Sequence, residues 1–106
     1  MRHMQEAVGL ALKMAGGRSR PDLTSDPMLA MALTRCLEII GEASSKLSGD
    51  ARLRFPGIPC GKMISMRNRL IHAYFDIDLD ILWTTVCEDL PPLLPILESA
   101  LAQIDG

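Results

Sequence analysis

Aromatic residues are scarce in this 106-residue chain, which contains one Trp, one Tyr and two Phe. Valine is also rare and occurs only at Val8 and Val86. Because β-strands are normally rich in β-branched and aromatic residues, this shortage argues against a sheet. The core must come from Leu, Ile, Met and Ala, which predicts packed helices. We expect a single domain over residues 1–106, built around one hydrophobic core.

Long apolar runs are also missing. None approaches the roughly 20 residues that cross a bilayer. The N-terminus lacks the basic-then-apolar layout of a signal peptide. The expectation is a cytoplasmic protein that makes no membrane contact.

Cysteines are few and odd in number. Cys36, Cys60 and Cys87 are widely separated, show no C-x-x-C spacing, and have no nearby histidine partner in His3 or His72. This pattern argues against disulfides and against a structural zinc site. We expect buried or half-buried free thiols, with no metal and no cofactor.

Basic residues are absent from the last part of the chain, although the net charge is only −2. Residues 76–106 carry seven acids, whereas residues 46–69 carry a single acid, Asp50. The basic residues of that segment are Lys46, Arg52, Arg54, Lys62, Arg67 and Arg69. A basic segment of this kind favours a phosphate-bearing ligand. Both blocks can equally be solvated helix faces, and the overall acidity argues against broad nucleic-acid coating.

Apolar periodicity predicts two helices in the first half of the chain. The first covers residues 2–15. The second has Asp26 as its N-cap and Pro27 at its first position, and is expected to end near Ser48. Gly41 lies in its middle, where glycine costs about 1 kcal/mol relative to alanine. Close approach of another backbone, for example across a dimer interface, would explain this glycine, and so would simple tolerance.

Two further helical segments are predicted in the second half. One covers residues 60–73, and another begins after Asp78 as N-cap. The Pro91-Pro92 pair should interrupt that helix, leaving a re-initiated or kinked helix over 91–104. Its inward-facing residues are expected to be Leu93, Leu94, Leu97, Leu101 and Ile104. Short connections then give an all-α, up-down bundle of four to five helices.

Residues 67–74, Arg-Asn-Arg-Leu-Ile-His-Ala-Tyr, place a guanidinium, an imidazole and a phenol close together. Arg67 and His72 are about 140° apart on an ideal helix, so they do not converge on one target. Either the helix ends or bends near His72, or two protomers supply the groups around a shared cleft. The alternative is that these residues have structural roles only: a packed or capping histidine, a solvated Arg-x-Arg face and a tyrosine anchor at the bundle rim.

These groups suit RNA cleavage. An imidazole can act as base on the 2′-hydroxyl or as acid on the leaving 5′-oxygen. A guanidinium can hold phosphate oxygens as negative charge develops on them. Arg69 could then contact the RNA backbone, and Asn68 could orient His72 or the substrate.

The sequence resembles HepT-type HEPN proteins in three stretches that follow one another along nearly the whole chain. The stretches are 37–43 (LEIIGEA), 58–75 (Ile58-Pro59 leading to MRNRLIHAYF) and 78–91 (DLDILW through EDLP). The motif at the centre of this resemblance is R-x4-H-x-Y, met by Arg67, His72 and Tyr74. Many such proteins have a longer first helix and an aromatic residue where this chain has Cys60.

The resemblance implies a HEPN homodimer with metal-independent ribonuclease activity and with Arg67 and His72 as catalytic residues. It also implies a toxin–antitoxin pair of a type II or VII kind. The antitoxin would be a minimal nucleotidyltransferase of the MntA type, which transfers AMP from ATP to Tyr74. Two other functions remain open: a non-catalytic dimeric module that binds a nucleotidyltransferase or a nucleotide, and an inactive helical dimer.

Overall fold

The computed structural model describes residues 1–72 and 78–105, apart from the side chains of Ile71, His72 and Asp105. All elements within these ranges are helical, which confirms the predicted all-α class. The helices are α1 (Arg2–Ala15), α2 (Asp22–Ser25), α3 (Pro27–Ser45), α4 (Gly49–Arg54), α5 (Cys60–His72), α6 (Leu79–Thr84), the π-helical segment η1 (Thr85–Asp89) and α7 (Leu90–Asp105). None of the helices in the described ranges combines the length and the apolar character that a membrane span requires.

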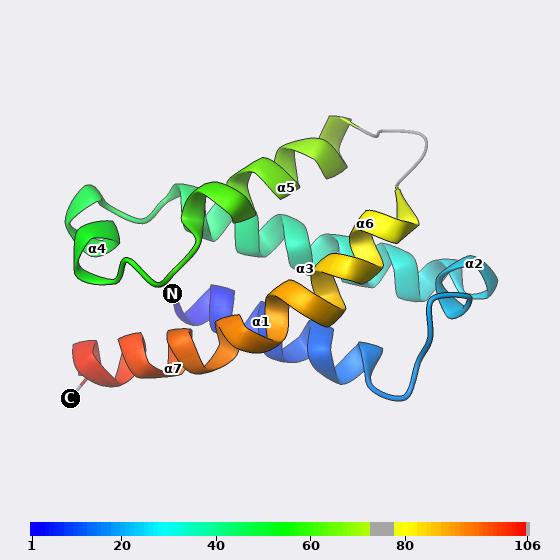
Figure 1. Cartoon of the computed structure of the whole chain (residues 1–106), viewed down its shortest axis with the longest axis horizontal. Coiled ribbons are helices and arrows are strands. Elements are labelled where there is room, and N and C mark those ends of the chain that lie inside the picture. The colour runs from blue at the N-terminus through cyan, green and yellow to red at the C-terminus, as the bar shows by residue number, and fades with distance from the viewer. Residues whose placement is uncertain (73–77, 106) are drawn as a thin grey trace.

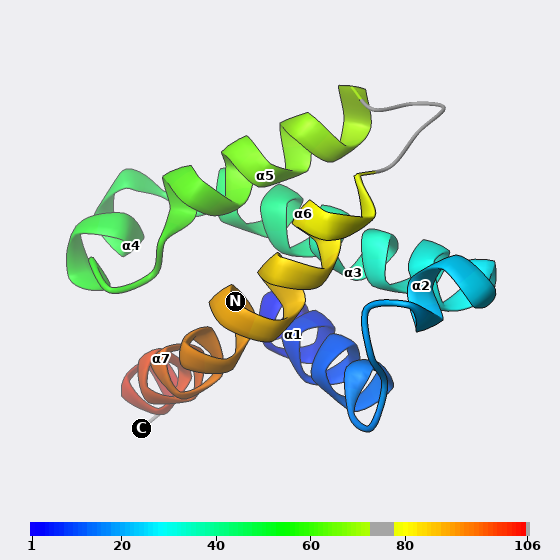
Figure 2. The ribbon, with the colours of Figure 1, turned by 45° about the vertical axis from the view of Figure 1, so that its right-hand side comes forward.

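Helix α3 occupies the centre of the molecule. It packs against α5 on one side and α1 on another, and α1 also packs against α7. In Figure 1, α1 and α5 run in one direction, whereas α3 and the α6–η1–α7 segment run in the opposite direction. This alternation follows the predicted up-down order. The turned view in Figure 2 shows the same arrangement, with α5 and α7 on different sides of the molecule.

Two of the predicted helix starts are confirmed by side-chain caps. Asp26 Oδ1 accepts a hydrogen bond from the Leu29 amide at 3.2 Å, and Pro27 follows in the first turn of α3. Asp78 Oδ1 accepts hydrogen bonds from the amides of Asp80 and Ile81 at 3.0 and 3.1 Å. Asp26 satisfies one amide and Asp78 two amides that have no partner within the helix, which fixes where α3 and α6 begin.

The end of the second predicted helix lies earlier than expected, and two short helices were not predicted. Helix α3 ends at Ser45. Ser48, near which the sequence predicted its end, instead caps α4 by accepting a hydrogen bond from the Ala51 amide at 3.0 Å. Serine is common at both sites, because its hydroxyl competes with the backbone for hydrogen bonds. Helix α2 lies between the first two predicted helices.

The Pro91-Pro92 pair does not interrupt the helix. The chain passes from α6 through η1 into α7 without a non-helical residue. The Leu90 amide donates to the carbonyl of Thr85, five residues earlier, which is the π-helical pattern. Both prolines then fall in the first turn of α7, where the missing amide is tolerated. The wider π turn therefore replaces the predicted break.

The core is built from apolar residues of α1, α3, α5, α6, η1 and α7. Its most deeply buried side chains are Met4, Val8, Leu33, Leu37, Ile40, Met63, Leu82, Val86, Leu90, Leu93 and Leu97. Two expectations were wrong. Ile104 was expected inward but is 48% exposed, because it lies in the last turn of α7. Cys87 is exposed on η1, whereas Cys36 and Cys60 are buried free thiols as expected.

Candidate functional site

Arg67 lies on α5 at the edge of the helix face that packs into the core. Met63, Met66 and Leu70 supply that face at a spacing of three to four residues and are almost fully buried. Arg67 follows Met66 and is half-buried, whereas the next two residues, Asn68 and Arg69, are exposed. The aliphatic part of the Arg67 side chain therefore borders the core, and the exposed surface of α5 begins next to it at Asn68 and Arg69.

Gly41 of α3 lies directly against Arg67. A Cβ atom at Gly41 would overlap Arg67 Cβ and would lie 3.0 Å from both Arg67 Cγ and the Met63 carbonyl oxygen. The sequence left two explanations for this glycine: close approach of another backbone, for example across a dimer interface, and simple tolerance. The structure places this contact within one chain, between α3 and α5. Only a residue without a side chain leaves room for it.

Among the described residues, the guanidinium of Arg67 has few partners. Nη2 donates a hydrogen bond to Oδ1 of Asn68 at 3.1 Å. Nε is buried and has no hydrogen-bond partner within the described structure. A buried donor without a partner costs stability and calls for an explanation, a catalytic role being one of the recognised ones. Asn68 was expected to orient His72 or the substrate, and in the structure its side chain contacts Arg67.

His72 belongs to α5 by its backbone, five residues after Arg67. Its side chain lies outside the described part of the molecule, as does the whole of Tyr74. The expected convergence of Arg67, His72 and Tyr74 therefore stays a prediction. Arg69 is exposed, and no hydrogen bond or ion pair involves it among the residues that the structure describes.

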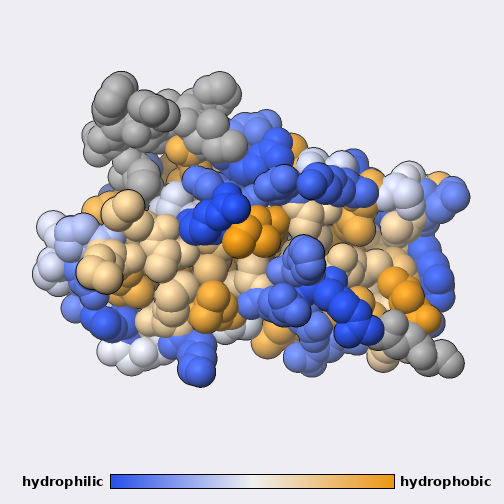
Figure 3. All heavy atoms as spheres, turned by 180° about the vertical axis from the view of Figure 1, so that it is seen from behind, coloured by the Kyte–Doolittle hydropathy of each residue, from blue (hydrophilic) through white to orange (hydrophobic). Residues whose placement is uncertain are grey.

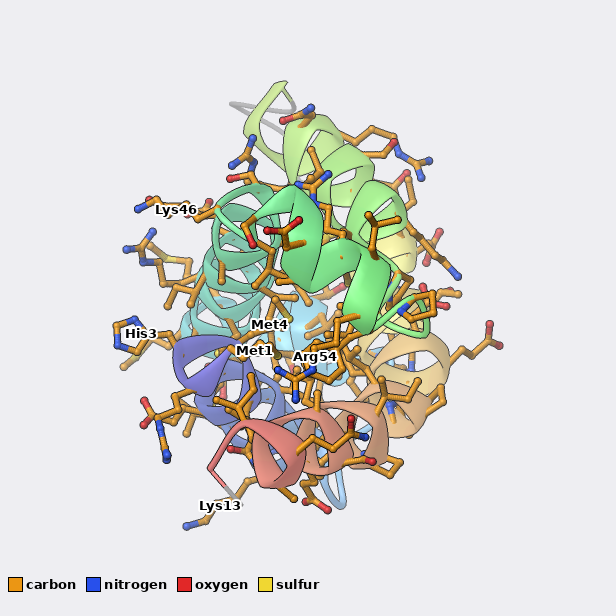
Figure 4. The ribbon with its side chains drawn as sticks, turned by 90° about the vertical axis from the view of Figure 1, so that its left-hand side faces the viewer. Met1, His3, Met4, Lys13, Lys46 and Arg54 are labelled. Atoms are coloured by element: carbon orange, nitrogen blue, oxygen red, sulfur yellow. The ribbon has the colours of Figure 1, made fainter. Side chains whose placement is uncertain are left out.

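Four other basic residues of segment 46–69 interact with groups other than Arg67. Each has a partner elsewhere: Lys46 with Glu42 at 3.2 Å, Lys62 with Asp89 at 2.8 Å, Arg52 with the Ser44 carbonyl at 3.0 Å, and Arg54 with the Gln103 carbonyl at 3.4 Å. In Figure 4, Lys46 points away from the molecule, whereas Arg54 lies between α1 and α7. Four of the six basic side chains are therefore engaged, and Arg67 and Arg69 remain as the candidates for a phosphate.

A hollow that Arg67 does not line was not predicted from the sequence. It is a groove of about 960 Å³ between α1, α3 and the end of α7, with Leu10, Ile39 and Ala43 among its apolar lining. Figure 3 shows this face, where apolar residues gather between polar ones. Met28 and Met31, which are exposed on α3, do not line this groove. Arg67 does not line the groove, so the candidate site lies outside it.

Comparison with known proteins shows the family to which the sequence belongs. The model of the HepT-like family, described as “Ribonuclease HepT-like”, matches residues 4–100, which include α3, Gly41 and the Arg67 motif. The chain belongs to the HepT-like ribonuclease family. No solved structure matches it.

Three relatives illustrate the HepT-like similarity. “Probable ribonuclease HepT” of Thermococcus cleftensis is 47% identical over 72 residues, 68% of this chain and 66% of the relative. “Putative RNase MJ1380” of Methanocaldococcus jannaschii is 44% identical over the same shares of the two chains. “Putative RNase TTE0752” of Caldanaerobacter subterraneus is 33% identical over 93 residues, 88% of this chain and 83% of the relative. The matched region thus spans about two thirds of the first two relatives and most of the third.

Proposed function

We propose that this HepT-like chain is an endoribonuclease that cleaves RNA without a metal ion, at a site built from Arg67 and His72 of two protomers. The observation that carries the proposal is the state of Arg67. Its stem is held against α3 and Nε is buried, and among the described residues Nη2 donates a hydrogen bond to Asn68 alone. A guanidinium held in this way is suited to a phosphate that gains negative charge.

The proposed reaction needs only imidazole and guanidinium groups. One His72 accepts the proton of the 2′-hydroxyl, and the 2′-oxygen attacks the adjacent phosphorus. The bond from phosphorus to the 5′-oxygen breaks, and an imidazolium gives that oxygen a proton. The products are a 2′,3′-cyclic phosphate and a free 5′-hydroxyl. Arg67 stabilises the charge on the non-bridging oxygens, and Arg69 binds a neighbouring phosphate.

A homodimer would supply what one copy lacks. One chain contributes a single Arg67 and a single His72, about 140° apart on α5. Two α5 helices related by a twofold axis would place two copies of each residue around one RNA backbone. The exposure of Asn68 and Arg69 next to half-buried Arg67 supports such a pairing, because this end of the site is open on one protomer.

The activity is proposed to be that of a toxin, neutralised by a partner nucleotidyltransferase of the MntA kind. In that reaction the phenol oxygen of Tyr74 attacks the α-phosphorus of ATP, pyrophosphate leaves, and the phenol proton passes to a base. The attached AMP would bring a negative phosphate beside the site, where it competes with RNA for Arg67 and blocks access. The position of Tyr74, two residues after His72, supports this mode of control.

Cleavage of RNA by the purified protein in the presence of EDTA tests the proposal. Arg67→Ala and His72→Ala should each reduce cleavage at least roughly 100-fold, while the oligomeric state stays unchanged. Lys13→Ala is the matched control, since it removes an exposed cation from α1 and should leave cleavage unchanged. In Figure 4 Lys13 points away from the helices. Unmodified protein that leaves RNA intact would contradict the proposal and favour a non-catalytic module that binds the nucleotidyltransferase.

Intact mass after co-expression with a nucleotidyltransferase of this kind tests the control mechanism. The expected result is a mass increase in whole AMP units that maps to Tyr74 and is absent from Tyr74→Phe. An unmodified Tyr74 in an inactive complex would contradict AMP transfer as the means of neutralisation.

A further inference from the structure

Gly41 is buried in the C-terminal part of α3, where it faces Met63 and Arg67 of α5. The atoms nearest to its missing side chain belong to Arg67 and to the Met63 carbonyl. The overlap with Arg67 Cβ involves an atom rigidly attached to the α5 backbone. A side chain at position 41 could therefore be accommodated only by moving the two helices apart.

Other helical glycines show that this contact is particular to Gly41. At Gly9 of α1 and Gly61 of α5, no atom outside the local helix lies within 4 Å of the place that a Cβ would occupy. Alanine would fit at both, and it is the better helix former. The low helix propensity of Gly41 is thus offset by a close approach that the other two glycines do not have.

The close contact between Gly41 and α5 fixes the first atoms of the Arg67 side chain. Cβ and Cγ rest on α3, and Nε is buried beside them. The hydrogen bond of Nη2 to Asn68 holds the far end of the guanidinium. Rotation about the first side-chain bonds is therefore restricted, and the charged end is presented at one place on the surface of α5.

We propose that Gly41 is a positioning residue for Arg67: by having no side chain, it lets α5 seat the arginine at the depth required for phosphate contact. This inference rests on the proposed ribonuclease function, in which Arg67 is catalytic. A displacement of about 1 Å at such a group can reduce a rate by roughly 100-fold. Gly41 touches no substrate, so its effect should pass entirely through Arg67.

The first arm of the test measures RNA cleavage by Gly41→Ala, with Gly61→Ala and Gly9→Ala as matched controls. Gly41→Ala should lower kcat/KM by roughly 100-fold, whereas both controls should keep wild-type cleavage. In an Arg67→Ala background, Gly41→Ala should cause no further loss, because the group it positions is already absent. An additive loss in the double variant, or wild-type cleavage by folded Gly41→Ala, would overturn the inference.

The second arm does not depend on activity. The Nε–Hε signal of Arg67 in an NMR spectrum, assigned with Arg67→Lys, reports the environment of the buried nitrogen. Gly41→Ala should shift this signal or speed its exchange with water, and Gly61→Ala should leave it unchanged. An unchanged Arg67 signal in Gly41→Ala would contradict the inference that Gly41 positions the Arg67 side chain. If the wild-type protein cleaves no RNA, the proposed function fails, and this arm still decides whether Gly41 seats Arg67.

A compensating variant covers the case in which Gly41→Ala is too unstable to assay. Arg67→Gly removes both side-chain atoms that meet the new methyl group. The combination of Gly41→Ala with Arg67→Gly should melt at a higher temperature than Gly41→Ala alone, even though glycine is a poor helix former. No recovery in the combined variant would show that the two residues do not oppose each other, and would overturn the inference.

Discussion

Arg67 donates a hydrogen bond from Nη2 to Oδ1 of Asn68, its neighbour on α5, at 3.1 Å. The amide is neutral, so it orients the guanidinium without cancelling its charge. This differs from the pairing of Lys62 with Asp89 or of Lys46 with Glu42, where a carboxylate opposes the cation. Arg67 is therefore held by groups that leave its full charge available to an anion.

Asn68→Asp should weaken RNA cleavage more than Asn68→Ala does. A carboxylate would bind the guanidinium of Arg67 more tightly and would repel the phosphate. We expect KM for RNA to rise by roughly tenfold, corresponding to about 1.4 kcal/mol of binding free energy. Asn68→Ala removes only the acceptor and should cause a smaller change. Equal KM values for the two variants would show that the charge at position 68 does not matter.

Arg67→Met should stabilise the fold while abolishing cleavage. The methionine side chain can replace the stem that rests on Gly41, and it removes the buried Nε donor that has no partner in the described structure. Removing such a donor should raise the free energy of unfolding by about 1 kcal/mol. Urea denaturation measures this change. Arg69→Met on the exposed face is the control and should stay within about 0.5 kcal/mol of wild type. A destabilised Arg67→Met would mean that the arginine itself supports the fold.

Local signals in the sequence predicted the helix starts well. Asp26 and Asp78 act through amides only two or three residues away, so their capping role is readable without knowledge of the fold. The π turn at η1 could not be predicted from the sequence. It depends on how the chain keeps Val86 and Leu90 in the core while accommodating Pro91. Short elements such as α4 depend similarly on their surroundings.

The candidate site was only partly predictable. Arg67 was identified from its motif, and Gly41 was recognised as unusual within a helix. Their contact joins residues 26 positions apart, and it depends on how far α5 is shifted along α3. Helical periodicity gives the inward face of each helix but not that relative position. The pairing of Asn68 with Arg67 was missed for another reason: neighbouring residues on a helix point in different directions, and only the length of the arginine allows the contact.

Asp78→Ala should lower stability by removing the cap of α6. Two amides, those of Asp80 and Ile81, would lose their acceptor. The expected loss is about 1 kcal/mol in the free energy of unfolding, measured by chemical denaturation. Asp78→Ser keeps a capping oxygen and should recover most of that loss. Asp50→Ala removes an acid from the first turn of α4 without removing its cap, which is Ser48, and should have little effect. An equal loss in the serine and alanine variants would exclude capping as the role of Asp78.

The three thiols should react with a labelling reagent in a fixed order. Cys87 is exposed on η1, whereas Cys36 and Cys60 are buried, so one thiol should react in the native protein and three after unfolding. Partial burial, and secondarily the charge of Glu88, raise the pKa of Cys87, and burial raises the pKa of Cys36. Because the thiolate is the reactive form, labelling of Cys87 should accelerate as the pH rises past the range of an ordinary cysteine.

The raised pKa of Cys36 predicts how the free energy of unfolding depends on pH. The folded protein holds the Cys36 thiol neutral. The contribution of Cys36 to the free energy of unfolding is therefore fully present below the pKa of an unfolded cysteine, about 8.5. It is lost as the pH rises from there toward the higher folded pKa, because the unfolded chain releases its proton first. The free energy of unfolding should therefore fall above about pH 8.5, and less so in Cys36→Ala. Parallel slopes for the variant and the wild type across that range would assign the alkaline loss to other groups.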